Sequence, residues 1–220
     1  TRPLFAAIAF LTVGVSLKFA LFPLHVWLPN AYAYAPSFTT AFLASTATKT
    51  AVYLILRYFY FVFGIGLVFQ VQPISDILLI LSLAAMFAAS TVAVFQDNIK
   101  RMLAYSSVAQ IGYITLGIGI ASMTGLTGGI VHLFNHALIK GALFVAVGAI
   151  VYRTGNGRIE NFAGIGRRMP LTMAGFVAAG LAIIGVPGTA GFISKWYLAL
   201  AALEKGWWWV VLALVASSLI

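Results

Sequence analysis

Cysteine is absent from this 220-residue chain, and charged residues are scarce at 8%. The absence of cysteine excludes disulfides, thiolate-bound iron–sulfur clusters and cysteine-type zinc sites within the chain. A soluble domain carries about 25% charged residues. The charged residues of this chain are too few to cover a surface that faces water. With 62% hydrophobic residues, the chain has lipid as its main solvent. The net charge of +9 does not indicate nucleic-acid binding, since the basic residues form no single face.

Catalytic motifs are missing as well. The sequence contains no Gly-x-Ser-x-Gly elbow, no His-Glu-x-x-His, no phosphate loop and no nucleotide-binding fingerprint. We therefore expect no active site and no cofactor on this chain itself.

Seven apolar segments follow one another along the chain. They run approximately over residues 4–28, 36–63, 74–95, 101–121, 125–152, 171–203 and 207–220. A bilayer core admits only helices and closed barrels, and the alternating segments of roughly ten residues that barrel strands show are not visible. The segments predict an all-α fold, a polytopic bundle of transmembrane helices. Since the chain enters an apolar run without an initial Met, and its last segment is shorter than the roughly 20 residues of a full span, we expect a fragment, with residues 1–220 in one domain.

The connections between segments alternate between two sides of the membrane. One side carries Lys100, Arg101, Arg153, Arg158, Arg167 and Arg168, and the other carries Arg2, Arg57 and Lys205. The positive-inside rule makes the first side cytoplasmic, and we expect a multi-pass protein of the cell inner (plasma) membrane. Trp207, Trp208 and Trp209 fit an aromatic belt at the outer interface.

Two of the segments carry helix breakers in their interior. The first contains Pro23 and then Pro29, and the sixth contains Pro187 between glycines at 185, 188 and 191. Proline removes a backbone donor and clashes one turn back, so both segments are predicted to be broken helices of the kind that line transport sites. Lys18 and Lys195 lie close to these breaks. The two segments run in opposite directions, which suggests an inverted repeat.

Lysines inside apolar segments are the main functional signal. Lys18, Lys49, Lys140 and Lys195 all lie at such positions, where a charge costs a few kcal/mol and usually marks an ion or proton path. Lys49 is surrounded in sequence by hydroxyl side chains that we expect to bind its amine, namely Ser45, Thr46, Thr48 and Thr50. The four acidic residues all lie near segment ends or in loops. These lysines are therefore either neutral much of the time or paired with carboxylates on other segments or subunits.

Histidines extend this set. His132, His136 and Lys140 are spaced four apart, which places them on one helix face, and imidazole titrates near neutral pH. The spacing predicts a proton ladder; the alternatives are a polar stripe that seals a helix contact and a metal or haem site. A metal site would need a third Cys, His or carboxylate ligand, and none lies nearby, so we expect no metal. His25, two residues after Pro23, is a candidate proton inlet or a residue that orients the break.

Several stretches resemble one family, the proton-conducting antiporter-like membrane subunits. These stretches are residues 18–31, 35–37, 48–53, 97–113, 132–144 and 191–196. The family includes membrane-arm subunits of respiratory complex I, related hydrogenases and large subunits of Mrp-type sodium/proton antiporters. The resemblance implies about fourteen helices in two inverted repeats with broken seventh and twelfth helices, of which this chain would cover the seventh to the thirteenth.

The resemblance also implies roles for the residues singled out above. Lys18 and Lys195 would be the lysines of the two broken helices, Lys49 the connecting lysine, and His132, His136 and Lys140 the central relay. A glutamate partner of Lys18 would lie on a fifth helix that this chain lacks.

The function expected from this resemblance is proton translocation within a multisubunit complex. The amino-acid sequence of residues 30–37, together with the lysine at position 195, resembles the Mrp-type subunits more than those of complex I. It favours a large antiporter-like subunit of an Mrp-type monovalent cation/proton antiporter. The alternatives are a membrane-arm proton-pumping subunit of NADH:quinone oxidoreductase (complex I) or a related hydrogenase, and a structural subunit that does not conduct. The expected partners are other membrane subunits, the lipid bilayer, protons and, in the Mrp reading, sodium.

Overall fold

A computed structural model describes residues 2–71 and 73–220 of the chain, and the regular structure there is helical. The helices are α1 (Arg2–Phe19), α2 (Trp27–Tyr34), α3 (Ser37–Arg57), α4 (Ile74–Val94), α5 (Ile99–Gly119), α6 (Met123–Thr154), α7 (Ile165–Arg168), α8 (Pro170–Ile184), α9 (Ala190–Glu204) and α10 (Trp208–Leu219). Two π-helical stretches, η1 (Tyr58–Val62) and η2 (Gly66–Val71), follow α3, and a 3-10 turn, η3 (Ile159–Phe162), precedes α7. Each of the seven predicted segments contains at least one helix, which confirms the all-α prediction.

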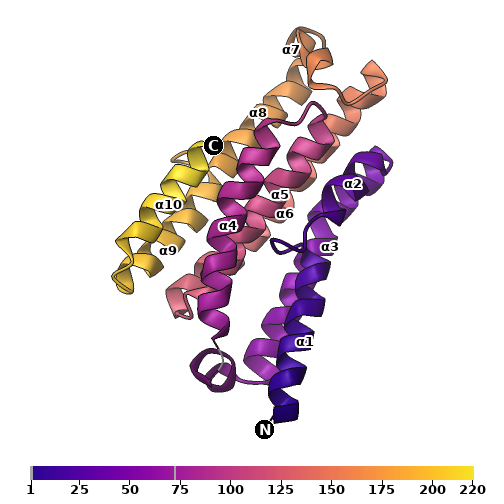
Figure 1. The fold of residues 1–220 in the computed structure, drawn as a ribbon. Coiled ribbons are helices and arrows are strands. Elements are labelled where there is room, and N and C mark those ends of the chain that lie inside the picture. The colour runs from indigo at the N-terminus through magenta and orange to yellow at the C-terminus, as the bar shows by residue number, and fades with distance from the viewer. Residues whose placement is uncertain (1, 72) are drawn as a thin grey trace.

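The long helices lie side by side in one bundle (Figure 1). Helices α4, α5 and α6 form its centre, with α1 to α3 on one side and α8 to α10 on the other. The N-terminus lies at one end of the bundle, and α7, which carries Arg167 and Arg168, lies at the opposite end. This arrangement agrees with the predicted division of basic residues between two sides.

Both predicted breaks are present. Helix α1 stops at Phe19, one residue after Lys18, and the chain enters α2 at Trp27. Helix α8 stops at Ile184, where Gly185 adopts a left-handed φ of 89°, and α9 begins at Ala190. In Figure 1, α1 runs toward the α7 end of the bundle and α8 runs away from it, so the two broken helices are antiparallel, as predicted.

The end of the first segment differs from its prediction. The apolar segment was expected to stop at residue 28, but helix α2 continues to Tyr34. Pro29 lies in the first turn of α2, where a backbone N–H has no intrahelical acceptor, so proline is tolerated there. The proline that breaks the helix is therefore Pro23, and Pro29 belongs to the helix that follows.

Three helices, α1, α4 and α6, are long and apolar enough to cross a membrane by length and composition, and α8 and α10 are shorter apolar helices. Helix α5 is the most enclosed of the bundle, since all but four of its 21 residues are buried. Its glycines allow this close packing: a Cβ on Gly112 would lie 2.8 Å from the Ser82 carbonyl oxygen of α4, and one on Gly117 would lie 2.6 Å from the Gly125 carbonyl oxygen of α6. The enclosed helix α5 positions the candidate site, because α6 and α9 pack against it.

Candidate functional site

The predicted ladder on α6 is buried. His132, His136 and Lys140 are 3%, 1% and 0% exposed, and all three lie on the helix face that is covered by neighbouring helices. The two imidazole rings are stacked, with centroids 6.4 Å apart and planes within 3°. The structure therefore brings together the three groups that the spacing predicted.

His132 has a hydrogen-bond partner at each ring nitrogen. Its Nε2 lies 2.9 Å from Oε1 of Gln110 on α5, and its Nδ1 lies 2.8 Å from Oγ of Ser194 on α9. The Ser194 hydroxyl donates to the Gly191 carbonyl at 2.9 Å, and in that orientation it accepts from Nδ1–H of His132. Serine and glutamine can each donate or accept, so His132 can exchange a proton without losing either partner.

His136 and Lys140 have different surroundings. Neither ring nitrogen of His136 has a hydrogen-bond partner among the described residues, although the ring is buried. The Lys140 side-chain nitrogen donates to the Leu103 carbonyl at 2.8 Å and to Oγ of Ser106 at 2.9 Å, both on α5. Two acceptors satisfy the two N–H groups of a neutral amine, whereas an ammonium has a third N–H to place.

Lys49 reaches this cluster from α3. It is buried, and α3 packs against the ladder helix α6. The prediction that neighbouring hydroxyls bind its amine is wrong, because Lys49 donates instead to the Ala44 carbonyl. The hydroxyls of Ser45, Thr46 and Thr50 bond carbonyls of their own helix, which is the usual solution for a hydroxyl on an apolar helix.

Lys195 stabilises the second helix break. Its Nζ donates to the Ile184 carbonyl, the last of α8, at 2.8 Å and to Oγ of Ser218 on α10 at 2.8 Å. A cation at a helix C-terminus is favoured by the helix dipole and by the unpaired carbonyls there. The same Nζ lies 4.5 Å from the ring centroid of Tyr113, and that ring packs against His132 with centroids 5.5 Å apart. Tyr113 therefore separates the ladder from Lys195.

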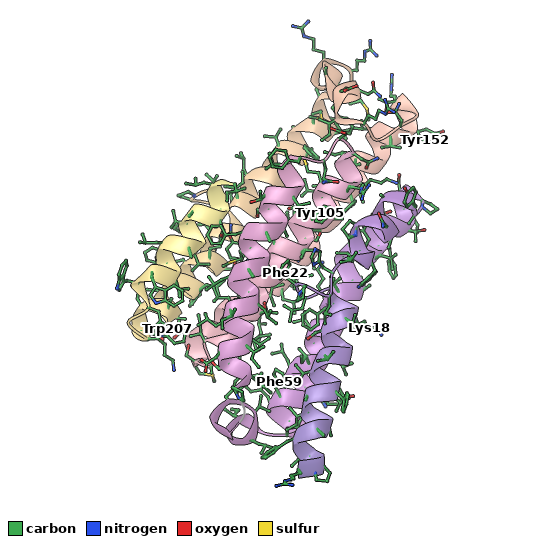
Figure 2. The ribbon with its side chains drawn as sticks, in the orientation of Figure 1. Lys18, Phe22, Phe59, Tyr105, Tyr152 and Trp207 are labelled. Carbon is green, nitrogen blue, oxygen red and sulfur yellow. The ribbon has the colours of Figure 1, made fainter. Side chains whose placement is uncertain are left out.

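Lys18 and His25 lie away from the cluster. Lys18 is exposed in the described structure, and Figure 2 shows its side chain directed away from the bundle. His25 lies in the break between α1 and α2, where its ring stacks on Phe22 at 5.2 Å and meets the edge of Tyr105 on α5 at 6.2 Å. The structure thus joins Lys49, His132, His136, Lys140 and Lys195 in one region, and it does not bring Lys18 or His25 to them.

Four further polar residues belong to the site and were not predicted. They are Ser106, Gln110, Tyr113 and Ser194. The first three are spaced four and three apart on α5, so the sequence carried a signal: polar side chains at helical spacing within an apolar segment. Among the described residues, no three His, Cys, Asp or Glu side chains come together in a way that could hold a metal ion.

The hydrogen bond between His132 and Ser194 gives a testable prediction. Replacement of Ser194 by alanine leaves Nδ1 of a buried imidazole without its partner, which costs about 1–3 kcal/mol. We expect proton transport by the full complex to fall about ten-fold, since 1.4 kcal/mol corresponds to a factor of ten. Ser82→Ala is the matched control, because the buried Ser82 hydroxyl bonds the Leu79 carbonyl of its own helix α4. Equal transport in the two variants would contradict a role for the Ser194 contact.

Comparisons with known proteins show the family of the chain. Residues 3–220 match the family model described as NADH:quinone oxidoreductase/Mrp antiporter, TM. NADH-quinone oxidoreductase subunit N of Desulforudis audaxviator (strain MP104C) is 46% identical over 97% of this chain and 42% of its own length.

Two solved structures are also similar. A chain of the Mrp complex from Dietzia sp. DQ12-45-1b matches all of this chain and 40% of its own length, at 31% identity and a TM-score of 0.90. A chain of the membrane-bound sulfane sulfur reductase, an archaeal respiratory membrane complex, matches 94% of this chain and 42% of its own length, at 34% identity and a TM-score of 0.83. The chain thus spans less than half the length of each of these relatives. The matches confirm the resemblance found in the sequence, and the chain belongs to the NADH:quinone oxidoreductase/Mrp antiporter transmembrane family, as a multi-pass membrane protein.

Proposed function

We propose that this chain is the proton-conducting part of an antiporter-like membrane subunit. The observation that carries the proposal is a row of basic groups across the bundle. It extends from the buried Lys49 on α3, through the buried His132, His136 and Lys140 on α6, to the half-buried Lys195 on α9. A row of titratable groups across the middle of a helical bundle is costly in lipid and is typical of proton paths.

The contacts of these groups support proton exchange over a purely structural role. Among the described residues, no carboxylate hydrogen-bonds Lys49, Lys140 or Lys195, and each lysine donates to neutral oxygens. A permanently charged lysine buried without a counter-ion would be strained, whereas a lysine that gains and loses a proton needs only neutral acceptors when it is neutral.

Lys18 and His25 enter the proposal as outer members of the path. Because the chain spans less than half the length of its relatives, we propose that the exposed face of α1 with Lys18 is covered by other parts of the longer subunit or by neighbouring subunits. In that setting Lys18 would meet a carboxylate partner, and His25 would serve as an inlet on the cytoplasmic side.

The parent complex is proposed to be an NADH:quinone oxidoreductase of the inner (plasma) membrane. The 46% identity to a subunit N favours this alternative over the Mrp type that the sequence analysis ranked first. The Mrp-type cation/proton antiporter remains the second candidate, because the bundle superimposes on the Mrp chain with a TM-score of 0.90. The partners would be other membrane subunits and protons, with sodium added in the Mrp case.

The choice between the two complexes is testable on native material. The full-length subunit is extracted with its partners in mild detergent, and the complex is examined by absorption spectroscopy and subunit mass. We expect flavin and iron–sulfur absorbance, since oxidation of NADH needs electron-carrying cofactors on the partner subunits. A colourless assembly of small membrane subunits would contradict the oxidoreductase assignment and support the Mrp type.

A further inference from the structure

A buried lysine that does not belong to the basic row lies at the α7 end of the bundle. Lys100 is part of the first turn of α5, is 8% exposed, and donates from Nζ to the Ala35 carbonyl at 3.0 Å. A lysine near the end of a transmembrane helix usually extends its amine to the water at the membrane surface. The side chain of Lys100 turns inward instead, so its burial is explained by the group that it binds.

That group is the end of α2, the second half of the first broken helix. Ala35 is the residue at which α2 ends, and its backbone is already extended. Carbonyls at a helix C-terminus lack intrahelical donors and lie at the negative end of the helix dipole, so a cation is favoured there. Lys195 makes the same kind of contact with the Ile184 carbonyl of α8. In both broken segments, therefore, a lysine binds the carbonyl at the end of a half-helix.

The backbone around Lys100 is fixed from the other side. The Asn98 side chain caps α5, since its Oδ1 accepts the Lys100 N–H at 2.9 Å. The turn before α5 also pairs with the loop after α6: the Ile99 N–H donates to the Gly157 carbonyl at 2.9 Å, and Asn98 forms an antiparallel bridge with Arg158. Because both turns are paired at this point, the first turn of α5 is a fixed base from which Lys100 reaches α2.

Helix α5 also contacts the middle of the first break. The ring of Tyr105 meets the ring of His25 edge to face, with centroids 6.2 Å apart. Helix α2 packs more extensively against α5 than against α3, and Leu28 on its buried face is 0% exposed. Helix α5 thus holds the second half of the break at two places, with Tyr105 at its start and Lys100 at its end.

We infer that Lys100 is a positioning residue of the first break. Its ammonium binds the end of α2 and keeps this half-helix, with His25 directly before it, against α5. The inference rests on the proposed proton-conducting function, in which His25 serves as an inlet, and it gives Lys100 no place in the proton path. A permanent positive charge suits a residue that binds a helix end, whereas a relay lysine has to lose its proton.

Arginine and methionine at position 100 separate these two roles. Arginine keeps the charge and the donors but does not lose its proton in a protein, whereas methionine has no donor at all. In the full complex, reconstituted in vesicles and followed with a pH-sensitive dye, transport is expected to fall about ten-fold in Lys100→Met and to stay within about two-fold in Lys100→Arg. Arg153→Met is the matched control, because it removes a positive charge from an exposed position at the same end of the bundle.

A cysteine on α2 measures the position of this half-helix directly. The 220 residues contain no cysteine, so Leu28→Cys places a single thiol in the tryptic peptide of residues 19–49. With Lys100→Met, its reaction with a water-soluble maleimide, quantified by mass spectrometry, is expected to be about ten-fold faster than with Lys100→Arg or Arg153→Met. The control thiol is Ala51→Cys on α3, a position that is 1% exposed, and it should react equally slowly in all three variants.

Two outcomes would overturn the inference through the arginine and reporter variants. Loss of transport in both Lys100→Arg and Lys100→Met, with the thiol at position 28 protected in both, would make Lys100 a proton carrier. Equal labelling at position 28 in all variants would show that Lys100 does not hold α2. If the methionine variant does not assemble, Lys100→Gln takes its place, since it keeps a neutral donor. Its labelling should then be faster than with arginine, and labelling as slow as with arginine would contradict the positioning role.

Lys49→Ala in the same transport assay keeps this inference apart from the proposed function. If Lys49→Ala abolishes transport while Lys100→Met transports normally, the first break does not depend on Lys100 and only the present inference fails. If neither variant lowers transport, the proton-conducting function fails as well.

Discussion

Replacement of Lys49 by alanine is expected to abolish ion-coupled transport while the complex still assembles. Lys49 is buried, donates to a single backbone carbonyl and lies on α3, which packs against the ladder helix α6. Without its amine, protons on α3 have no titratable group from which to reach α6. Loss of a positioned proton-transfer group typically costs a factor of about 100 or more, and dye-monitored proton uptake by vesicles that contain the full complex measures it.

Thr46→Ala is the control on the same helix. The Thr46 side chain is exposed and its hydroxyl bonds the Phe42 carbonyl of α3, so its loss leaves the basic row unchanged. A second variant, Lys49→Met, keeps most of the side-chain volume and tests the amine alone. Normal transport in Lys49→Met would show that the amine is not part of a relay, and the interpretation of the buried lysines as a proton path would fail.

The largest effect on stability is expected for Gly191→Ala in the second break. A Cβ at this position would overlap the Ala182 carbonyl oxygen of α8. That oxygen belongs to the backbone, so the two halves of the broken helix would have to move apart. We expect a loss of at least about 3 kcal/mol, the upper range for overpacking, and a lower yield and melting temperature of the complex.

Gly180→Ala provides a matched comparison, since Gly180 lies on α8 and a Cβ there would meet nothing within 4 Å. Alanine within a helix is usually favoured over glycine by roughly 0.5–1 kcal/mol, so this variant should be neutral or slightly stabilised. If both variants melt at the same temperature, α8 and α9 do not approach each other at Gly191 as described. Movement of α9 would also displace Ser194 and Lys195, so transport should fall together with stability in Gly191→Ala.

Much of the fold could be predicted because each signal was local. Apolar runs marked the helices, and the breakers Pro23 and Gly185 marked the two interruptions. The error at α2, where Pro29 is read as a second breaker, had a local cause as well. A proline in the first turn of a helix and a proline that ends a helix look the same in a sequence. Only the backbone conformation of the residues before the proline distinguishes the two cases.

The candidate site could be predicted only in part. The spacing of His132, His136 and Lys140 fixed their common face, but the partners of neutral polar side chains depend on neighbouring helices. Ser106 and Ser107 illustrate this: the first binds Lys140 of α6, whereas the second bonds a carbonyl of its own helix. Adjacent identical residues thus have different roles, and nothing in their local sequence distinguishes them. The same limit explains the wrong prediction for the hydroxyls around Lys49.

The enclosure of α5 has a consequence for how the protein is made. This helix is not among the three that are apolar enough to cross a membrane by themselves, and its Lys100, Gln110 and hydroxyl groups would be costly if they faced lipid tails during synthesis. Helix α4 is strongly apolar, packs extensively on α5 and is joined to it by a turn of four residues, 95–98. Insertion into the bilayer should therefore proceed with α4 and α5 as one hairpin, and a ribosome-bound chain that ends after α5 would already hold its polar helix against a partner.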